Sequence, residues 1–195
     1  MGRWAHGGEC VFGYGSLAVR AHRTAGPMVW PEGFVAQLRD ARRIWGVAMD
    51  NRRDLPGYKY YTDPAGSRPP AFVAFLDLVF GDGMGATVGG RCLPVNDRLL
   101  AELDRRERNY RRIDVTDRID VSEHVAGADA RVWTYVGTAA GRERLREGRR
   151  TGTAVIDAHY LQAVRAGLAA LRTDDARTLD TDGIPVAELI RHDLP

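Results

Sequence analysis

The pattern of hydrophobic and polar positions predicts that strands come first along the chain and helices later. Short runs rich in β-branched and aromatic residues, separated by turn signals such as Gly26-Pro27 and Gly81-Asp82-Gly83, are typical of strands. The predicted strands are Cys10–Gly13, Phe34–Met49, Lys59–Thr62, Ala71–Phe80, Ala86–Leu93, Tyr110–Val121 and Arg131–Val136. The second run is long enough to form two strands or one strongly bent strand.

Helical spacing of apolar residues predicts helices at Asp97–Arg108, Ala158–Leu171 and Val186–Arg191. In the second of these, Asp157 is an N-cap candidate, and an inner stripe is formed by Leu161, Val164, Leu168 and Leu171. This order lacks the alternating strand–helix rhythm of a doubly wound sheet. The chain is therefore predicted to be an α+β protein, built around a small twisted β-barrel with flanking helices.

The helix predicted at Asp97–Arg108 carries one acid on its apolar face. Its apolar residues are Leu99, Leu100 and Leu103. At about 100° per residue, Glu107 falls roughly 35° from the centre of this stripe, whereas Asp104 lies about 90° away. Glu107 is thus the acid that points inward and the candidate general base. The alternative explanation is that Glu107 merely pairs with an arginine at a frayed helix end.

The segment Val11–Leu17 predicts a buried strand that runs into a glycine-flanked loop, whose backbone N–H groups could face a ligand. Gly13-x-Gly15-x-x-Ala18 also matches a dinucleotide-binding pattern, but Gly26-Pro27 would interrupt the helix that this pattern requires. A nucleophile elbow at Ser16 would need glycine where Tyr14 and Ala18 stand. The loop is therefore interpreted as a cradle for an anion, with Ser16 as one of its ligand-binding residues.

The loop Phe12–Leu17, followed far downstream by Leu103-Asp104-x-x-Glu107, resembles the γ-glutamylcyclotransferase-like superfamily. This superfamily includes γ-glutamylamine cyclotransferases and AIG2-like proteins. The resemblance extends over roughly Val11 to Leu171, and it implies a mixed small barrel that carries the site. It implies Glu107 as the catalytic residue and the following substrate-binding residues: Tyr14, Gly15, Ser16, Leu17, Tyr110, Tyr135 and Tyr160.

The activity that the resemblance implies is an intramolecular cyclisation, of a lyase or acyl-transferase type, in glutathione and γ-glutamyl metabolism. The α-amine of a γ-glutamyl compound attacks its own γ-carbonyl, which releases 5-oxoproline and an amino acid or amine. Because the substrate supplies the nucleophile, a single partly buried carboxylate can remove one proton and return another. The scheme requires no cofactor and no metal. Two alternatives remain: a biosynthetic enzyme that removes a γ-glutamyl protecting group, and a non-catalytic AIG2-like binding protein.

Two segments depart from the family pattern. Arg108 and Asn109 stand directly after Glu107, where many relatives have glycine. The stretch from Asn51 to Pro70 is longer and more basic than expected, and Arg52-Arg53 within it would favour a polar or acidic leaving group. Both departures affect the expected substrate more than the expected reaction.

Composition narrows the class of partner. The 195 residues are expected to form one domain (1–195), with a core at about 11–171 and a helical C-terminal tail. The net charge of +2 gives no reason to expect nucleic acid or membrane as a partner. The family resemblance implies a small γ-glutamyl molecule as the partner. The two cysteines, Cys10 and Cys92, are interpreted as free thiols, which suits the cytoplasm. The protein is expected to be a monomer or a homodimer, and the mixed-charge run Arg142–Arg150 to be a solvated helix face.

Overall fold

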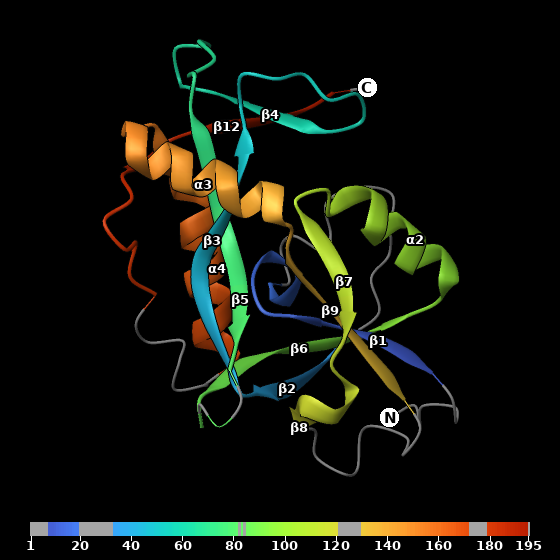
Figure 1. Cartoon of the computed structure of the whole chain (residues 1–195). Coiled ribbons are helices and arrows are strands. Elements are labelled where there is room, and N and C mark those ends of the chain that lie inside the picture. Colours follow the sequence, from blue (N-terminus) through green and yellow to red (C-terminus); the bar gives the residue numbers. More distant parts are fainter. Residues whose placement is uncertain are drawn as a thin grey trace.

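The computed structural model describes residues 8–19, 33–81, 83, 85–120, 130–171 and 179–194 (Figure 1). The strands are β1 (Glu9–Gly13), β2 (Phe34–Arg39), β3 (Ala41–Asp50), β4 (Lys59–Thr62), β5 (Phe72–Phe80), β6 (Thr87–Val95), β7 (Tyr110–Asp114), β8 (Ile119–Asp120), β9 (Arg131–Gly137), β10 (Ala154–Asp157), β11 (Val186–Ala187) and β12 (Ile190–Asp193). The helices are α2 (Asp97–Arg106), α3 (Ala139–Thr151) and α4 (Ala158–Leu171), with short 3-10 turns η1 (Ser16–Ala18) and η2 (Thr116–Arg118).

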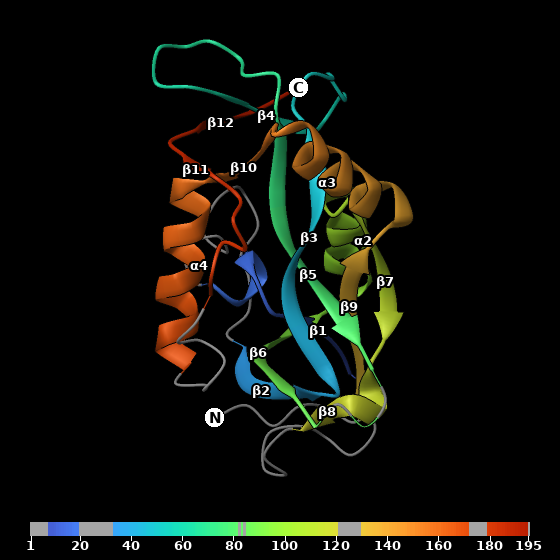
Figure 2. The same cartoon turned by 60° about the vertical axis from the view of Figure 1, so that its left-hand side comes forward.

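The strands form two mixed sheets and a small ribbon. The larger sheet has the order β7-β9-β1-β6-β2-β8, in which β1 and β9 are parallel and every other pair is antiparallel. The second sheet has the order β11-β10-β5-β3, and β4 pairs with β12 in an antiparallel ribbon. In Figures 1 and 2 the long strands β3 and β5 curl against the larger sheet to give a half-barrel, and the ribbon lies at one end of it. The predicted α+β fold built on a small twisted barrel is confirmed.

The buried carboxylate of Asp77 in β5 ties the two sheets together. It accepts hydrogen bonds from the backbone N–H groups of Gly137 in β9, at 2.7 Å, and of Leu78, at 2.8 Å. Its second oxygen accepts from Arg142 Nε at 2.8 Å. Arg144 also turns toward the core and donates to the Ala48 carbonyl at 2.8 Å. The prediction that the run Arg142–Arg150 is a solvated face is therefore wrong for these two arginines, because α3 packs them across the edge of β3 and β5.

The helix α2 forms where the sequence predicts it, but it ends at Arg106 rather than at the predicted Arg108, so Glu107 follows the helix as its C-cap residue. Asn96 caps it by accepting from the Leu99 backbone N–H at 2.9 Å, and the chain leaves the helix at Glu107. Leu100 and Leu103 are buried in a second, smaller core with Val11 and Leu17, so α2 lies against the start of the chain. The apolar stripe thereby fixes how the end of α2 faces the loop that follows β1.

Both ends of α4 agree with the sequence, including the Asp157 cap, whose carboxylate accepts from the Tyr160 N–H at 3.1 Å. The run Phe34–Met49 forms two strands, because Asp40 turns the chain with φ of 53°. The helix predicted at Val186–Arg191 is wrong: this segment forms β11 and β12, since it pairs with β10 and β4. The strand predicted at Tyr110–Val121 is divided into β7 and β8 by η2, and Val121 lies outside the described residues. No helix within the described ranges is both long and apolar enough to cross a membrane.

Candidate functional site

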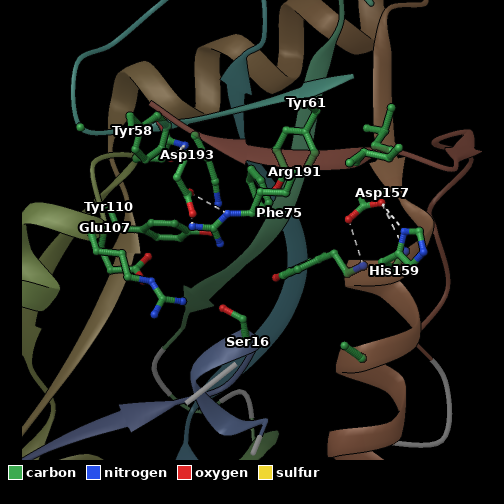
Figure 3. A pocket seen from close by; sticks show the side chains of 18 of the residues that line it. Ser16, Tyr58, Tyr61, Phe75, Glu107, Tyr110, Asp157, His159, Arg191 and Asp193 are labelled. Carbon is green, nitrogen blue, oxygen red and sulfur yellow. Dashed lines mark hydrogen bonds and ion pairs between the residues drawn. The ribbon is translucent and has the colours of Figure 1, made fainter. Parts of the chain in front are cut away.

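A cavity of about 780 Å³ opens between the ribbon, the end of α2 and the start of α4. Such a volume lies in the range of small-molecule sites, about 300–1,000 Å³. Figure 3 shows Ser16 at its base, Glu107 on one side and Asp157 on the other, with Arg191 and Asp193 of β12 above them. We call this space the outer chamber.

A narrower space, of about 30 Å³, lies behind it, and we call it the inner chamber. Its walls are made by Phe12, Gly13, Tyr14, Gly15, Ser16, Leu17, Leu76, Glu107, Tyr110, Tyr135 and Tyr160. Four of these residues also line the outer chamber: Ser16, Glu107, Tyr110 and Tyr160. The inner chamber thus contains every site residue that the sequence predicts, and it joins the outer chamber at Glu107 and Ser16.

The loop after β1 is shaped by close packing. A side chain on Gly13 would place its Cβ only 2.6 Å from Leu17 Cβ, so only glycine allows η1 to fold back on the strand. Arg43 Nε donates to the Tyr14 carbonyl at 2.8 Å and holds the loop from the opposite strand. Among the described residues, no hydrogen-bond acceptor reaches the backbone N–H groups of Ser16 and Leu17. These N–H groups begin a 3-10 turn and are suited to an anion.

Glu107 stands at the end of α2, where its backbone N–H still bonds to the Leu103 carbonyl at 2.8 Å. Its side chain is 15% exposed and lines both chambers. Arg106 Nε lies 3.5 Å from Glu107 Oε1, whereas the guanidinium of Arg108 lies over the Tyr58 ring. The carboxylate is therefore held at the junction of the chambers by its helix and by one arginine.

The turn after Glu107 is anchored by Asn109, which is buried. Its side-chain oxygen accepts from Arg144 at 2.7 Å, and its amide nitrogen donates to the Tyr58 hydroxyl at 3.1 Å. Its backbone carbonyl accepts from the Thr138 N–H at 2.9 Å. Asn109, which departs from the family pattern, thus fastens the segment carrying Glu107 to α3 and to Thr138, the N-cap of that helix.

The tyrosines present rings to the inner chamber, while most of their hydroxyls bond to protein. Tyr14 donates to the Tyr135 carbonyl and Tyr110 to the Leu76 carbonyl, both at 2.7 Å. Tyr135 donates to Asp104 at 2.7 Å. Burial raises the pKa of all four hydroxyls, so they remain protonated at neutral pH. The rings shape the chamber, and these hydroxyls fix the rings.

Sequence reasoning missed the ribbon side of the outer chamber. Lys59, Tyr61, Arg191 and Asp193 line it, together with Asp157 and His159 at the start of α4. Arg52 and Arg53, which the sequence suggested for an acidic leaving group, instead pair with Asp50 at 2.7 and 3.3 Å and do not line the cavity. The described residues hold no group of three or more His, Cys, Asp or Glu side chains that could bind a metal ion.

No family model matches the sequence, and no curated protein matches it. Seven chains of solved structures are similar, and two of them show the extent of the likeness. One is the human uncharacterized protein loc79017, with a TM-score of 0.51 and 15% identity. The other is a γ-glutamyl cyclotransferase, with a TM-score of 0.50 and 15% identity. Each match covers 85% of this chain and 80% of the other. The chain therefore has the fold of a γ-glutamyl cyclotransferase, and the resemblance predicted from its sequence is confirmed at the level of fold.

Proposed function

We propose that this protein is a γ-glutamylcyclotransferase-type enzyme. The α-amine nitrogen of a γ-glutamyl compound forms a bond to its γ-carbonyl carbon, and the bond from that carbon to the leaving nitrogen breaks. On the way from ammonium to lactam N–H the α-nitrogen loses two protons. Glu107 accepts one before the attack and passes it to the leaving nitrogen as the bond to carbon breaks; the second is lost from the attacking nitrogen and ends on the released amine or in water. The products are 5-oxoproline and an amino acid or amine.

The observation that carries this proposal is the position of Glu107 between the chambers. Its carboxylate is 15% exposed and shares the inner chamber with Ser16 and the glycine-flanked loop. A general base must be within hydrogen-bonding reach of the proton it removes, and a substrate whose γ-glutamyl group lies against Glu107 and Ser16, where the two chambers meet, would meet this requirement. The likeness to a γ-glutamyl cyclotransferase supports an enzyme of this fold.

The loop supplies what a cyclisation needs besides a base. The N–H groups of Ser16 and Leu17, which no described acceptor reaches, can bind the substrate α-carboxylate or the oxyanion of the tetrahedral intermediate. The rings of Tyr110 and Tyr160 would hold the glutamyl chain folded on itself. Such positioning contributes up to about 7–11 kcal/mol in intramolecular reactions.

The test is release of 5-oxoproline, measured by mass spectrometry, from γ-glutamyl dipeptides, glutathione and γ-glutamylamines. Glu107→Gln is expected to lower kcat by roughly 10²–10⁴, the usual contribution of a general acid–base residue. Glu143→Gln is the matched control, because Glu143 is exposed on α3 and pairs with Arg146. A near-normal rate in Glu107→Gln would remove Glu107 from the mechanism. Folded wild-type protein that releases no 5-oxoproline would favour the binding-protein alternative.

The size of the outer chamber favours one second candidate. About 780 Å³ is far more than the inner chamber offers, and a bulky leaving group would fill it better than a small amine. An enzyme that removes a γ-glutamyl protecting group from a larger biosynthetic intermediate would use the same Glu107 chemistry. Adding γ-glutamylated amines of increasing size to the panel tests this candidate, which predicts that kcat/KM rises with leaving-group size.

A further inference from the structure

The chain contains 28 lysine and arginine residues, and Lys59 is its only lysine; the other 27 are arginine. It is the first residue of β4, and its side chain lines the outer chamber but not the inner one. An ammonium differs from a guanidinium because it is compact, and because burial readily removes its charge. The chain thus places its single amine side chain on the wall of the cavity.

The Lys59 ammonium has no carboxylate partner among the described residues, unlike the arginine side chains that line the same cavity. Arg191 lies 2.6 Å from Asp193, Arg106 lies 3.5 Å from Glu107, and Arg105 pairs with Glu102. Within the described part of the chain, no hydrogen bond or ion pair reaches Lys59 Nζ. Its neighbours are aromatic rings: the centroid of Phe75 lies 4.1 Å from Nζ, and that of Tyr58 lies 5.7 Å away.

The surroundings of Lys59 disfavour its charge while the cavity is empty. Burial, and after it the charge of Arg191, lowers the pKa of Lys59 to about 7; Glu107 opposes this effect, Arg106 adds to it, and Asp193 opposes it. A buried ammonium without an anion is costly, and an anion within hydrogen-bonding distance relieves that cost. A carboxylate that enters the outer chamber would therefore pair with Lys59 and stabilise its charged form.

We propose that Lys59 is the anion-binding group of the outer chamber and holds a carboxylate on the leaving side of the substrate. The proposal rests on the proposed function, which puts the reacting γ-glutamyl group against Glu107 and Ser16, where the two chambers meet. Because Lys59 lines the outer chamber and not the inner one, its anion belongs to the group beyond the scissile bond. The substrate is then a γ-glutamyl amino acid or peptide, whose leaving amine carries a carboxylate, in preference to a γ-glutamylamine.

Two ligands that differ by one carboxylate test the proposal: γ-glutamyl-L-alanine and γ-glutamylethylamide. Calorimetry with the Glu107→Gln protein measures binding without turnover. We expect γ-glutamyl-L-alanine to bind roughly 10- to 100-fold more tightly, the value of a hydrogen bond to a charged group. Adding Lys59→Met should abolish this preference and leave the affinity for γ-glutamylethylamide unchanged. Adding Arg53→Met, which removes an exposed cation outside the cavity, should leave the preference intact.

Three results would overturn the proposal. The two ligands could bind equally to the Glu107→Gln protein, the preference could survive Lys59→Met, or both ligands could lose affinity equally. The last result would assign Lys59 to the α-carboxylate that both ligands share. A preference that depends on Lys59, found in a protein whose wild type releases no 5-oxoproline, would keep the anion site and reject the proposed function. Release of 5-oxoproline by the wild type, together with a ligand preference that does not depend on Lys59, would keep the proposed function and reject the anion site.

Amine labelling provides a second measurement that needs no substitution at Lys59. Acetic anhydride modifies unprotonated amines, and the peptide that contains Lys59 is the only lysine peptide of the chain. In the Glu107→Gln protein, γ-glutamyl-L-alanine should slow acetylation of Lys59 at least tenfold, whereas γ-glutamylethylamide at equal saturation should slow it far less. Equal protection by the two ligands would contradict an anion site at Lys59.

Discussion

The partly buried charge of Lys59 is expected to make the fold less stable at low pH. Folding lowers the pKa of this amine from its usual 10.5 to about 7, chiefly by burial. At about 1.4 kcal/mol per tenfold change in proton affinity, the difference corresponds to roughly 5 kcal/mol. This value is an upper limit, because water and side-chain relaxation reduce the cost of a buried charge.

The direction in which the free energy of unfolding changes with pH follows from the number of protons that each state binds. Between about pH 7 and pH 10.5 the unfolded chain keeps a proton on Lys59, while the folded chain has released it. The unfolded state therefore binds more protons, and this residue makes the free energy of unfolding rise with pH across that window. Below about pH 7 both states are protonated, and the full cost of the buried charge is present.

Lys59→Met removes the charge and keeps an apolar stem of similar length. Urea unfolding at pH 6.0 and pH 9.5 should show that the stability of Lys59→Met relative to wild type is greater at pH 6.0, by up to about 3 kcal/mol. Arg53→Met is the control, because Arg53 is 79% exposed, and its effect should stay within about 0.5 kcal/mol at both pH values. Equal differences for Lys59→Met at the two pH values would refute the reasoning.

Three further substitutions test how the site is held. Asn109→Ala should lower kcat for 5-oxoproline release at least tenfold with little change in KM, because Asn109 orients the Glu107 segment through Arg144; equal effects on both constants would contradict a positioning role. Gly13→Ala should lower the free energy of unfolding in urea by about 1–3 kcal/mol, since its Cβ would overlap Leu17. Leu103→Ala should cost about 2–5 kcal/mol in the same assay, because Leu103 is fully buried under α2, and a loss below 1 kcal/mol would contradict that packing.

The segments that the sequence predicted well carry local signals. In α2, the Asn96 cap and the leucine stripe fix the helix and the direction of Glu107. In the loop after β1, Gly13 permits a close approach that no other residue allows. These features depend on neighbours within a few residues, so spacing and residue type suffice to find them.

In the C-terminal segment, the local spacing of apolar residues predicts the wrong element. Val186, Leu189 and Ile190 are spaced as on a helix, yet the chain there is extended. Ile190 pairs with Thr62 and Val186 with Ile156, so the conformation depends on strands far away in the sequence. Tertiary pairing overrides a local periodicity of this length, because two-residue and four-residue strands have almost no signal of their own.

The two chambers therefore differ in what the sequence can reveal about them. The inner chamber is built from Tyr14–Leu17 and the end of α2, whose local patterns predict a base beside an anion cradle. The outer chamber depends on the β4–β12 ribbon, which brings Lys59 and Arg191 together only through long-range pairing. In the proposed function, reaction chemistry belongs to the first and recognition of the leaving group to the second. It follows that a pattern sufficient to suggest cyclisation could not name the substrate, and that the ribbon is where substrate preference is expected to change under mutation.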